Sequence, residues 1–406
     1  MSFSATSKRS RLTKGRIKKL AIALAGASLV LASAAPGVEV ATAGGRYSKT
    51  SRTIRRGLSL ISVVDSNGPN RIKVLKIDPS TDMTIDVALA NEVLPGRETT
   101  SSMARRHGAI AAVNGNFGTS WGRPLGLFAE DGLLHTSPIA SGGAFAISQD
   151  ETKAFVGYPD LKVEARNLTT RKSWTIKDWN DLSPTRSGIS GYTKAGGESV
   201  RPPQGSCSVR LVAKTKLGWN PLRVGVSRTY RVDRKKCSSE RLELNGGIVL
   251  AAPRGSNGAR MLDAARSDQL VQLGWSLGWA GVMDAIGGSP VLMRDGEVIT
   301  DSCSGYVCQR HPRTGVGVMP NGNILLVTVD GRRSSSVGMT IVEFARLFKW
   351  LGAESAMNLD GGGSATMVLN GNVVNSPSDS GGERAVVSSL LVLPNPDAGE
   401  PRVVGS

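Results

Sequence analysis

The sequence predicts a β-rich α+β fold: a single catalytic domain with few helices and many hairpins. Hydrophobic residues make up 40% and charged residues 20% of the 406 positions, a balance typical of a globular chain. The 49 glycines and the low aromatic content (5%) favour a turn-rich, strand-rich protein over a helical bundle. Two apolar runs, LFAEDGLLH (127–135) and VLMRDGEVI (291–299), are each broken by Asp-Gly, the strongest short hairpin signal.

Strands are expected where short runs are rich in β-branched residues. These runs are Leu58–Val64, Arg71–Ile77, Met83–Ala90, Ala109–Val113, Asn323–Val329, Thr366–Leu369 and Ala385–Leu393. A short helix is expected over Thr99–His107. The clearest helix is Thr340–Leu351, because Thr340 and Glu343 form a T-x-x-E capping box and Gly352 follows as a C-terminal stop.

Residues 1–43 are predicted to be a signal peptide. Seven Lys or Arg residues precede Leu20–Ala35, a run of 16 small and apolar residues, and both Ala32–Ala34 and Ala41–Ala43 resemble cleavage sites. The run is short for a membrane span, which needs about 20 residues; an uncleaved N-terminal anchor is the alternative. We expect an exported protein, secreted or in the cell envelope, without a stable membrane span once the signal is cleaved.

The remaining chain is expected to have three parts. Residues 44–57 are polar and basic and predict a linker, residues 58–393 form the main domain, and residues 394–406 form a polar tail. Within the main domain, a more polar and irregular stretch over about 160–240 predicts a variable insertion or subdomain.

The net charge favours acidic partners. The formal charge is +17, and +11 remains after residues 1–43 are removed. Such an excess favours phosphate-bearing polymers or anionic envelope surfaces. No basic run is interleaved with aromatic residues, so we do not expect nucleic acid to be the partner.

Four cysteines, an even number in an oxidising compartment, predict two disulfides. Proximity in the sequence favours Cys207–Cys237 and Cys303–Cys308. Zinc is the rival interpretation, but the spacing is not CxxC and the chain has only three histidines. We therefore expect no metal and no cofactor.

The stretch NLDGGGSATMVLNG (358–371) is the first candidate for a functional site. Successive glycines allow backbone N–H groups to converge on an anion, or allow the backbone to approach a ligand closely. Asp360 and Ser364 then stand at the two rims of Gly361–Gly363. The alternative is a glycine-rich hairpin in which both side chains cap local N–H groups.

The stretch QRHPRTGVG (309–317) places His311, Arg313 and Thr314 close together. A guanidinium group matches a phosphate bidentately, and histidine titrates near neutral pH. The alternative is a surface loop with a solvated arginine and a packed histidine.

Two further stretches carry polar side chains. In AVNGNFG (112–118), the amides of Asn114 and Asn116 suit sugar hydroxyls, although an Asn-Gly turn is the plainer interpretation, and the nearby Trp121 is suited to stack on a sugar. In NSPSDSGGERAV (375–386), Arg384 lies in a loop with two carboxylates, which a salt bridge also explains. The signatures HExxH and GxxxxGK[ST] are absent.

Taken together, these stretches resemble the phosphodiester glycosidase family. The resemblance covers most of residues 58–393 and rests on five segments in the family's order: HGAIAAVNGNF, AIGGSPVLMRDGEV, HPRTGVGVMPNGNILLVTVDGR, LGAESAMNLDGGGSATMVLNGNVVN and SPSDSGGERAV. The family pattern implies a site formed by Asn114, His311, Arg313, Asp330, Asp360, Gly361, Gly362, Gly363, Ser364 and Arg384. A single aromatic residue, Phe117, stands where the family usually has two, which bears on sugar specificity.

The resemblance implies a hydrolase that cleaves the C1–O bond of a phosphodiester-linked sugar of the N-acetylglucosamine 1-phosphate type. The expected substrate is a phosphate-containing glycan of an envelope or capsule. Asp360 is the first candidate for the catalytic carboxylate and Asp330 the second, while His311 activates water or binds phosphate. The alternatives are a non-catalytic binder of anionic glycans and a phosphodiesterase that cuts on the phosphorus side, for which a metal cluster is expected.

Overall fold

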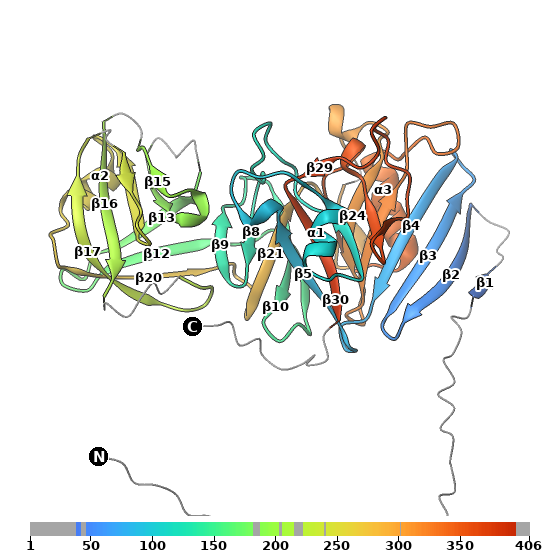
Figure 1. Ribbon diagram of the computed structural model, residues 1–406, viewed down its shortest axis with the longest axis horizontal. Helices are drawn as coiled ribbons and strands as arrows, with labels where there is room; N and C mark the ends of the chain where they lie inside the picture. The colour runs from blue at the N-terminus through green and yellow to red at the C-terminus, as the bar shows by residue number, and fades with distance from the viewer. Residues whose placement is uncertain are drawn as a thin grey trace, which may run out of the picture. The chain divides into compact units, whose positions relative to one another are not determined.

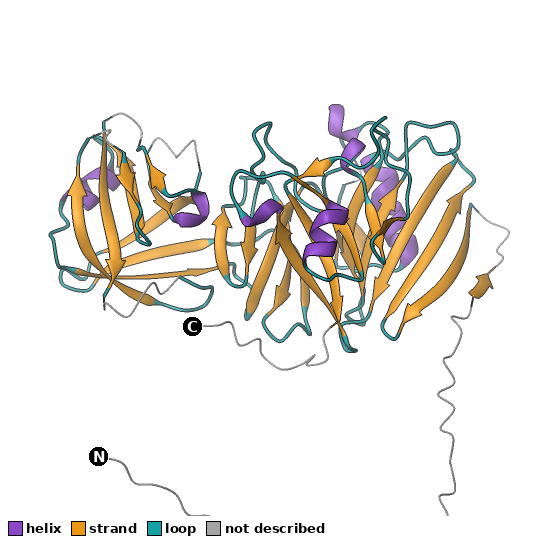
Figure 2. Cartoon of the chain, viewed as in Figure 1, coloured by secondary structure: helices purple, strands orange, loops and turns teal. Residues whose placement is uncertain are grey.

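The structure is a computed structural model that describes residues 38–41, 46–181, 187–202, 205–214, 222–238, 241–300 and 302–394 (Figure 1). Strands dominate these residues, and the helices are few and short (Figure 2). The predicted α+β, mostly β class is therefore confirmed. Most of the expected signal peptide and nearly all of the expected tail lie outside the described residues. Within residues 1–43, Val38–Ala41 forms an edge strand, β1, rather than part of a leader alone.

An antiparallel sheet of nine strands forms the first layer, in the order β1-β2-β3-β4-β25-β24-β26-β22-β23. Its strands after β1 are β2 (Tyr47–Arg55), β3 (Leu58–Asp65), β4 (Asn70–Ile77), β22 (Val291–Arg294), β23 (Glu297–Val298), β24 (Arg313–Val318), β25 (Ile324–Val329) and β26 (Ser355–Asn358). Helix α3 (Ile341–Leu351) buries Phe344 and Phe348 with Val74 and Val327 of this sheet. The capping box and the left-handed Gly352 predicted for this helix are both present.

Two five-stranded sheets build the rest of the main core. One has the order β28-β27-β7-β30-β5, and the other β11-β10-β21-β8-β9. Their strands are β5 (Met83–Leu89), β7 (Ala111–Asn114), β8 (Phe128–Glu130), β9 (Leu133–Thr136), β10 (Gly143–Ser148), β11 (Ala154–Gly157), β21 (Val282–Gly288), β27 (Met367–Leu369), β28 (Asn372–Val373) and β30 (Ser388–Pro394). Side chains from all three sheets, such as Leu326, Val113 and Phe145, pack into one apolar core.

Helix α1 (Thr100–Arg106) packs through Met103 and Ala104 on β7, β27 and β30. Short elements complete this part: β6 (Glu98–Thr99), β29 (Ala385–Val386), and the 3-10 turns η1 (Ala90–Glu92), η3 (Tyr306–Cys308) and η4 (Gly362–Ser364). Both Asp-Gly hairpins form as predicted, β8–β9 and β22–β23. In the residues that the structure describes, no helix is long and apolar enough to cross a membrane.

A closed seven-stranded barrel is built from residues 162–276. Its strands are β12 (Lys162–Asn167), β13 (Ser173–Trp179), β14 (Ile189–Tyr192), β16 (Ser206–Ala213), β17 (Arg228–Lys236), β19 (Ile248–Pro253) and β20 (Leu270–Ser276), with α2 (Asn257–Asp263), η2 (Lys194–Gly196), and the pair β15 (Ser199–Val200) and β18 (Leu242–Glu243). Trp174, Tyr230 and Trp275 are buried in its core. The predicted disulfide Cys207–Cys237 forms here, and Cys303–Cys308 forms beside η3.

Two of the expected segment boundaries need correction. The stretch 44–57 is not a linker over most of its length, because β2 pairs with β3 from Tyr47 to Arg55. Most of its side chains are polar and exposed, and it lies next to the edge strand β1, which explains why the segment has the composition of a linker. The insertion expected over about 160–240 coincides with the barrel at its start but ends too early, since β19, α2 and β20 continue the barrel to Ser276.

Candidate functional site

The glycine turn after β26 lies where the ends of β7 and β24 meet. Asn114, the last residue of β7, donates from Nδ2 to the carbonyl oxygen of Asp360 at 2.6 Å. Its Oδ1 accepts from Thr314 Oγ1 at 2.7 Å and from the Thr366 N–H at 3.1 Å. Asn114 is fully buried, so its amide holds three chain segments together and positions Asp360.

Two of the three glycines are pressed against the backbone of Pro312. A Cβ atom on Gly361 would lie 2.6 Å from the Pro312 oxygen, and the N–H of Gly362 donates to that same oxygen at 2.9 Å. Gly362 has φ +61°, a left-handed conformation that suits glycine. The N–H of Ser364 also donates within the turn, to the Gly361 oxygen at 3.1 Å, so the N–H groups of Gly362 and Ser364 are both used by the protein itself.

The third glycine, Gly363, lies against an ion pair. Arg384 donates from Nε and NH2 to the carboxylate of Asp379, at 2.7 and 3.0 Å, and both groups occupy the space of a side chain at position 363. Arg332 approaches the turn from the other side, with one guanidinium nitrogen 3.1 Å from the Cβ position of Gly362. Two arginine side chains, both substantially exposed to solvent, therefore flank the glycine turn.

Asp360 is the carboxylate beside these cations. Burial raises its pKa to about 6, against the opposing effects of a hydrogen bond with Ser364, the charge of Arg384, the N–H of Gly361 and the charge of Arg97. The side chain is thus ionised for the most part at neutral pH and protonated in mild acid. A carboxylate with this pKa in a partly open site is suited to a chemical role.

His311 lies at the edge of the same region. Its Nε2 atom is 3.0 Å from the carbonyl oxygen of Tyr306, and the two rings pack with centroids 4.6 Å apart. Tyr306 belongs to the loop closed by Cys303–Cys308. The pKa of His311 is lowered by burial and by the charges of Arg313 and Arg332, against the opposing effect of the hydrogen bond with Tyr306.

Arg313 is not brought to Asp360. Adjacent residues of a strand point to opposite faces, and Thr314 faces Asn114, so Arg313 faces the start of α3. There its Nε donates to the Met339 oxygen at 2.8 Å and NH2 donates to the Gln309 oxygen. Burial lowers its pKa to about 10. Arg332 and Arg384, which flank the turn, are therefore better candidates than Arg313 for the phosphate-binding role.

Asp330 also lies one step away from the turn. Its Oδ1 accepts from Asn375 Nδ2 at 3.1 Å and from the Ser376 N–H at 2.9 Å, and burial raises its pKa. Asn375 in turn donates to the Ala365 oxygen at 3.0 Å, directly after the turn. Asp330 therefore fixes the loop that leads to Asp379, and its position favours a structural role over a catalytic one.

Asn116 supports a hairpin that borders a hollow. Its Nδ2 donates to the Leu127 oxygen and its Oδ1 accepts from Ser388 Oγ, both at 3.0 Å, so the buried amide is occupied within the protein. The hollow has a volume of about 490 Å³, and Trp121 at its rim is 66% exposed. Arg97 connects the hollow to the turn, because it donates to the oxygen of Thr119, which lines the hollow, and its charge lowers the pKa of Asp360.

Two residues of this region were missed by the sequence analysis. Arg332 follows Asp330 in the segment VDGRR, so its place at the end of a buried strand was an available signal. Arg97 stands alone in a polar loop, where no pattern distinguishes it from other surface arginines.

Comparison with known proteins agrees with the motifs. Residues 222–393 match the phosphodiester glycosidase family, a range that contains His311, Asp360 and Arg384. A mouse N-acetylglucosamine-1-phosphodiester alpha-N-acetylglucosaminidase is 40% identical over 80 residues, 20% of this chain and 15% of the relative. A prophage-derived uncharacterized protein of Bacillus subtilis is 41% identical over 83 residues, 20% of this chain and 13% of the relative.

These matches span only a small part of the curated relatives' length. A solved structure covers far more of the chain: a hypothetical protein from Synechocystis aligns with 88% of this chain and 64% of its own, at 22% identity and a TM-score of 0.70. At 22% identity, this similarity supports a shared fold and nothing further. The resemblance predicted from the motifs is confirmed, since residues 222–393 match the phosphodiester glycosidase family model.

Proposed function

We propose that this protein is an exported glycoside hydrolase that cleaves the C1–O bond of a sugar 1-phosphodiester, of the N-acetylglucosamine 1-phosphate type, in an envelope or capsular glycan. One observation carries the proposal: Asp360 lies on a turn that Arg332 and Arg384 flank. This arrangement supports a role for the carboxylate at the sugar carbon and for the guanidinium groups at the phosphate.

The leaving group decides what the site must supply. When C1–O breaks, the electron pair stays on the phosphate oxygen, and the resulting phosphomonoester is a stable anion that needs little protonation. It needs charge stabilisation, which a guanidinium group gives through paired N–H donors. Asp379 accepts from Nε and NH2 of Arg384 at 2.7 and 3.0 Å, which fixes the guanidinium group and leaves its remaining N–H groups for a phosphate oxygen.

The sugar carbon develops positive charge at the same time. An ionised Asp360 stabilises the oxocarbenium-like transition state or attacks C1 directly. If the sugar carries a 2-acetamido group, its carbonyl oxygen attacks C1 instead, and Asp360 orients the amide. Water then forms the new C1–O bond, and the imidazole of His311, whose pKa is lowered by burial, is the candidate to accept its proton.

The hollow beside the turn is proposed to receive the sugar. Its volume of about 490 Å³ lies within the range of small-ligand sites, roughly 300–1,000 Å³. The exposed indole of Trp121 offers a flat apolar surface on which a pyranose ring packs, and Asp178 and Asn180 line the same hollow with polar atoms. Export is supported by the basic and apolar N-terminal sequence and by two disulfides.

The test is hydrolysis of an N-acetylglucosamine 1-phosphate diester in ¹⁸O-labelled water, with products identified by mass spectrometry. The expected result is labelled free sugar and an unlabelled phosphomonoester, lost in Asp360→Asn and kept in Asp82→Asn, an exposed aspartate at another place in the fold. Label in the phosphate would move the cut to the phosphorus side and reject the mechanism.

A non-catalytic binder of anionic glycans is the second candidate, and the basic charge of the chain favours it. Calorimetric titration separates the two. A binder leaves the diester intact and binds it equally well as the native chain and as Asp360→Asn, whereas the enzyme converts it and loses turnover in the variant.

A further inference from the structure

The positive charge of the protein is concentrated in the barrel. Residues 162–276 contain 21 Lys or Arg and 9 Asp or Glu residues, a net charge of +12. The rest of the chain after position 43 contains 22 basic and 23 acidic residues, a net charge of −1. The part of the molecule that holds Asp360 is therefore close to neutral, and the barrel alone accounts for the basic character of the chain.

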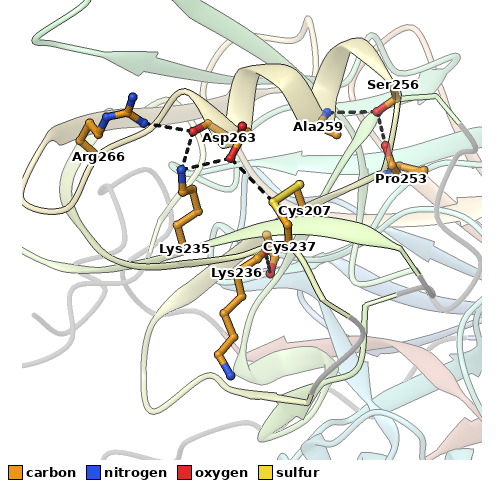
Figure 3. The surroundings of a disulfide bond; sticks show 10 residues. Cys207, Lys235, Lys236, Cys237, Pro253, Ser256, Ala259, Asp263 and Arg266 are labelled. Atoms are coloured by element: carbon orange, nitrogen blue, oxygen red, sulfur yellow. Dashed lines mark hydrogen bonds and ion pairs between the residues drawn. A yellow bond between two sulfur atoms is a disulfide. The ribbon is translucent and has the colours of Figure 1, made fainter.

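The carboxylates of the barrel do not offset this charge. Asp233, Asp263 and Asp268 are each engaged by a cation of the barrel, Arg210, Lys235 and Arg231 respectively. Around the Cys207–Cys237 disulfide, Asp263 receives Lys235 Nζ at 3.1 Å on its carboxylate, and its backbone oxygen also accepts from Arg266 (Figure 3). Each of these three carboxylates is thus paired with one cation, which leaves most of the barrel's 21 basic residues in excess over its 9 acidic ones.

One end of the barrel contains a pocket suited to an anion. It lies between the β12–β13 turn and α2, has a volume of about 400 Å³, and includes Lys172 and Arg260 in its lining. The other lining residues are Asn167, Thr170, Trp174, Asn257, Met261 and Ala264, with no carboxylate among them. Trp174 is 3% exposed, and in the described part of the chain its indole N–H has no hydrogen-bond partner.

We infer that the barrel binds a linear, phosphodiester-linked polyanion, with one phosphate in the pocket of Lys172 and Arg260. The identity of this polymer as the substrate rests on the proposed function; the binding itself does not. A polyanion held by the barrel presents its sugar–phosphate bonds to the turn of Asp360 at a raised local concentration. The near-neutral remainder of the chain then needs to recognise only a single diester.

The test uses the full-length mature chain carrying Asp360→Asn, so that the polymer is not degraded, and poly(glycerol phosphate) as the probe. Affinity is measured by calorimetry at about 50, 150 and 500 mM salt, where screening changes strongly. The double variant Lys172→Gln/Arg260→Gln is compared with Arg294→Gln/Arg346→Gln, which removes two exposed cations outside the barrel. The barrel variant is expected to bind about five- to tenfold more weakly and with a smaller salt dependence, and the control within about twofold of the parent.

A second measurement separates this inference from the proposed function. With Asp360 intact, the barrel variant is expected to hydrolyse a small soluble diester at the parent rate. Equal polymer affinity of the barrel and control variants would overturn the inference, and so would stronger binding of duplex DNA or anionic vesicles than of the polymer. Polymer binding without hydrolysis of any diester would instead reject the proposed function, while still supporting polyanion binding by the barrel.

Discussion

Arg384 and Asp379 form a bidentate ion pair in the space that a side chain at position 363 would occupy. The glycine run is therefore tied to the orientation of an arginine. Side chains are excluded from this turn by the groups that surround it: the Pro312 oxygen at Gly361, Arg332 at Gly362 and the ion pair at Gly363.

The first prediction concerns Gly363→Ala. The added methyl group collides with both members of the ion pair, so Arg384 must move away from the turn. We expect kcat/KM for the diester to fall at least about tenfold and the free energy of unfolding to fall by about 1–3 kcal/mol. Gly381→Ala is the matched control, because nothing lies within 4 Å of its Cβ position. Equal effects of the two substitutions, in activity assays and urea unfolding, would contradict the role of the pair.

The second prediction concerns pH. The pKa of Asp360 is about 6, and activity requires its ionised form, so kcat/KM should rise with pH and level off above about pH 7. The charge of Arg384 lowers this pKa. Arg384→Gln should therefore shift the acidic limb to higher pH, in addition to lowering the maximum rate. Arg346→Gln, a change on the exposed face of α3, should leave the limb in place.

The third prediction concerns Trp121→Ala. If the sugar packs on this exposed indole, its loss should raise KM about tenfold, a stacking contribution of roughly 1–2 kcal/mol, and change kcat little. Tyr158→Ala removes a similarly exposed aromatic residue and serves as the control. Steady-state kinetics with a single diester is sufficient. A fall in kcat at constant KM would place Trp121 outside the sugar-binding region.

The fourth prediction concerns stability and the carboxylate of Glu130. Burial, with the charges of Asp86, Asp131 and Glu92, raises its pKa to about 8. Since the folded state holds this proton more tightly than the unfolded state, its contribution to stability is complete below about pH 4.5 and is lost as pH rises towards 8. In the native chain the free energy of unfolding should therefore fall by at most about 1.4 kcal/mol per pH unit in this window. Glu130→Gln mimics the protonated form, so this pH dependence should disappear in the variant. Urea unfolding at several pH values tests this, and a pH-independent difference would contradict it.

Local signals in the sequence were sufficient for much of the fold. The capping box of α3 and the Asp-Gly hairpins depend on neighbouring residues, and both form as predicted. The strand β2 was missed because it lies near the sheet edge and exposes polar side chains, so its composition does not differ from that of a linker. The extent of the barrel was missed because closure depends on pairing β12 with β20, more than a hundred positions later.

In the candidate site too, features set by neighbouring residues were predicted and features set by distant partners were not. Asp360, Ser364 and Arg384 were predicted to lie together, and the structure places them around one turn. The two faces of β24 could not be assigned in advance, because alternation says that Arg313 and Thr314 point apart without saying which one faces the turn. Only the partner Asn114, two hundred positions earlier, settles that orientation.

The way the chain enters and leaves the barrel has an evolutionary consequence. The chain leaves the main core after β11 and returns in β21, and both strands pair with the same strand, β10. The two connections lie side by side, because the Asp160 N–H donates to the Leu277 oxygen at 3.0 Å and β12 pairs with β20 from Lys162 and Ser276 onward. A segment attached through such neighbouring points can be shortened, lengthened or exchanged without rethreading the sheets. The barrel can thus vary in length and sequence, while the strands that position the glycine turn keep their pairing.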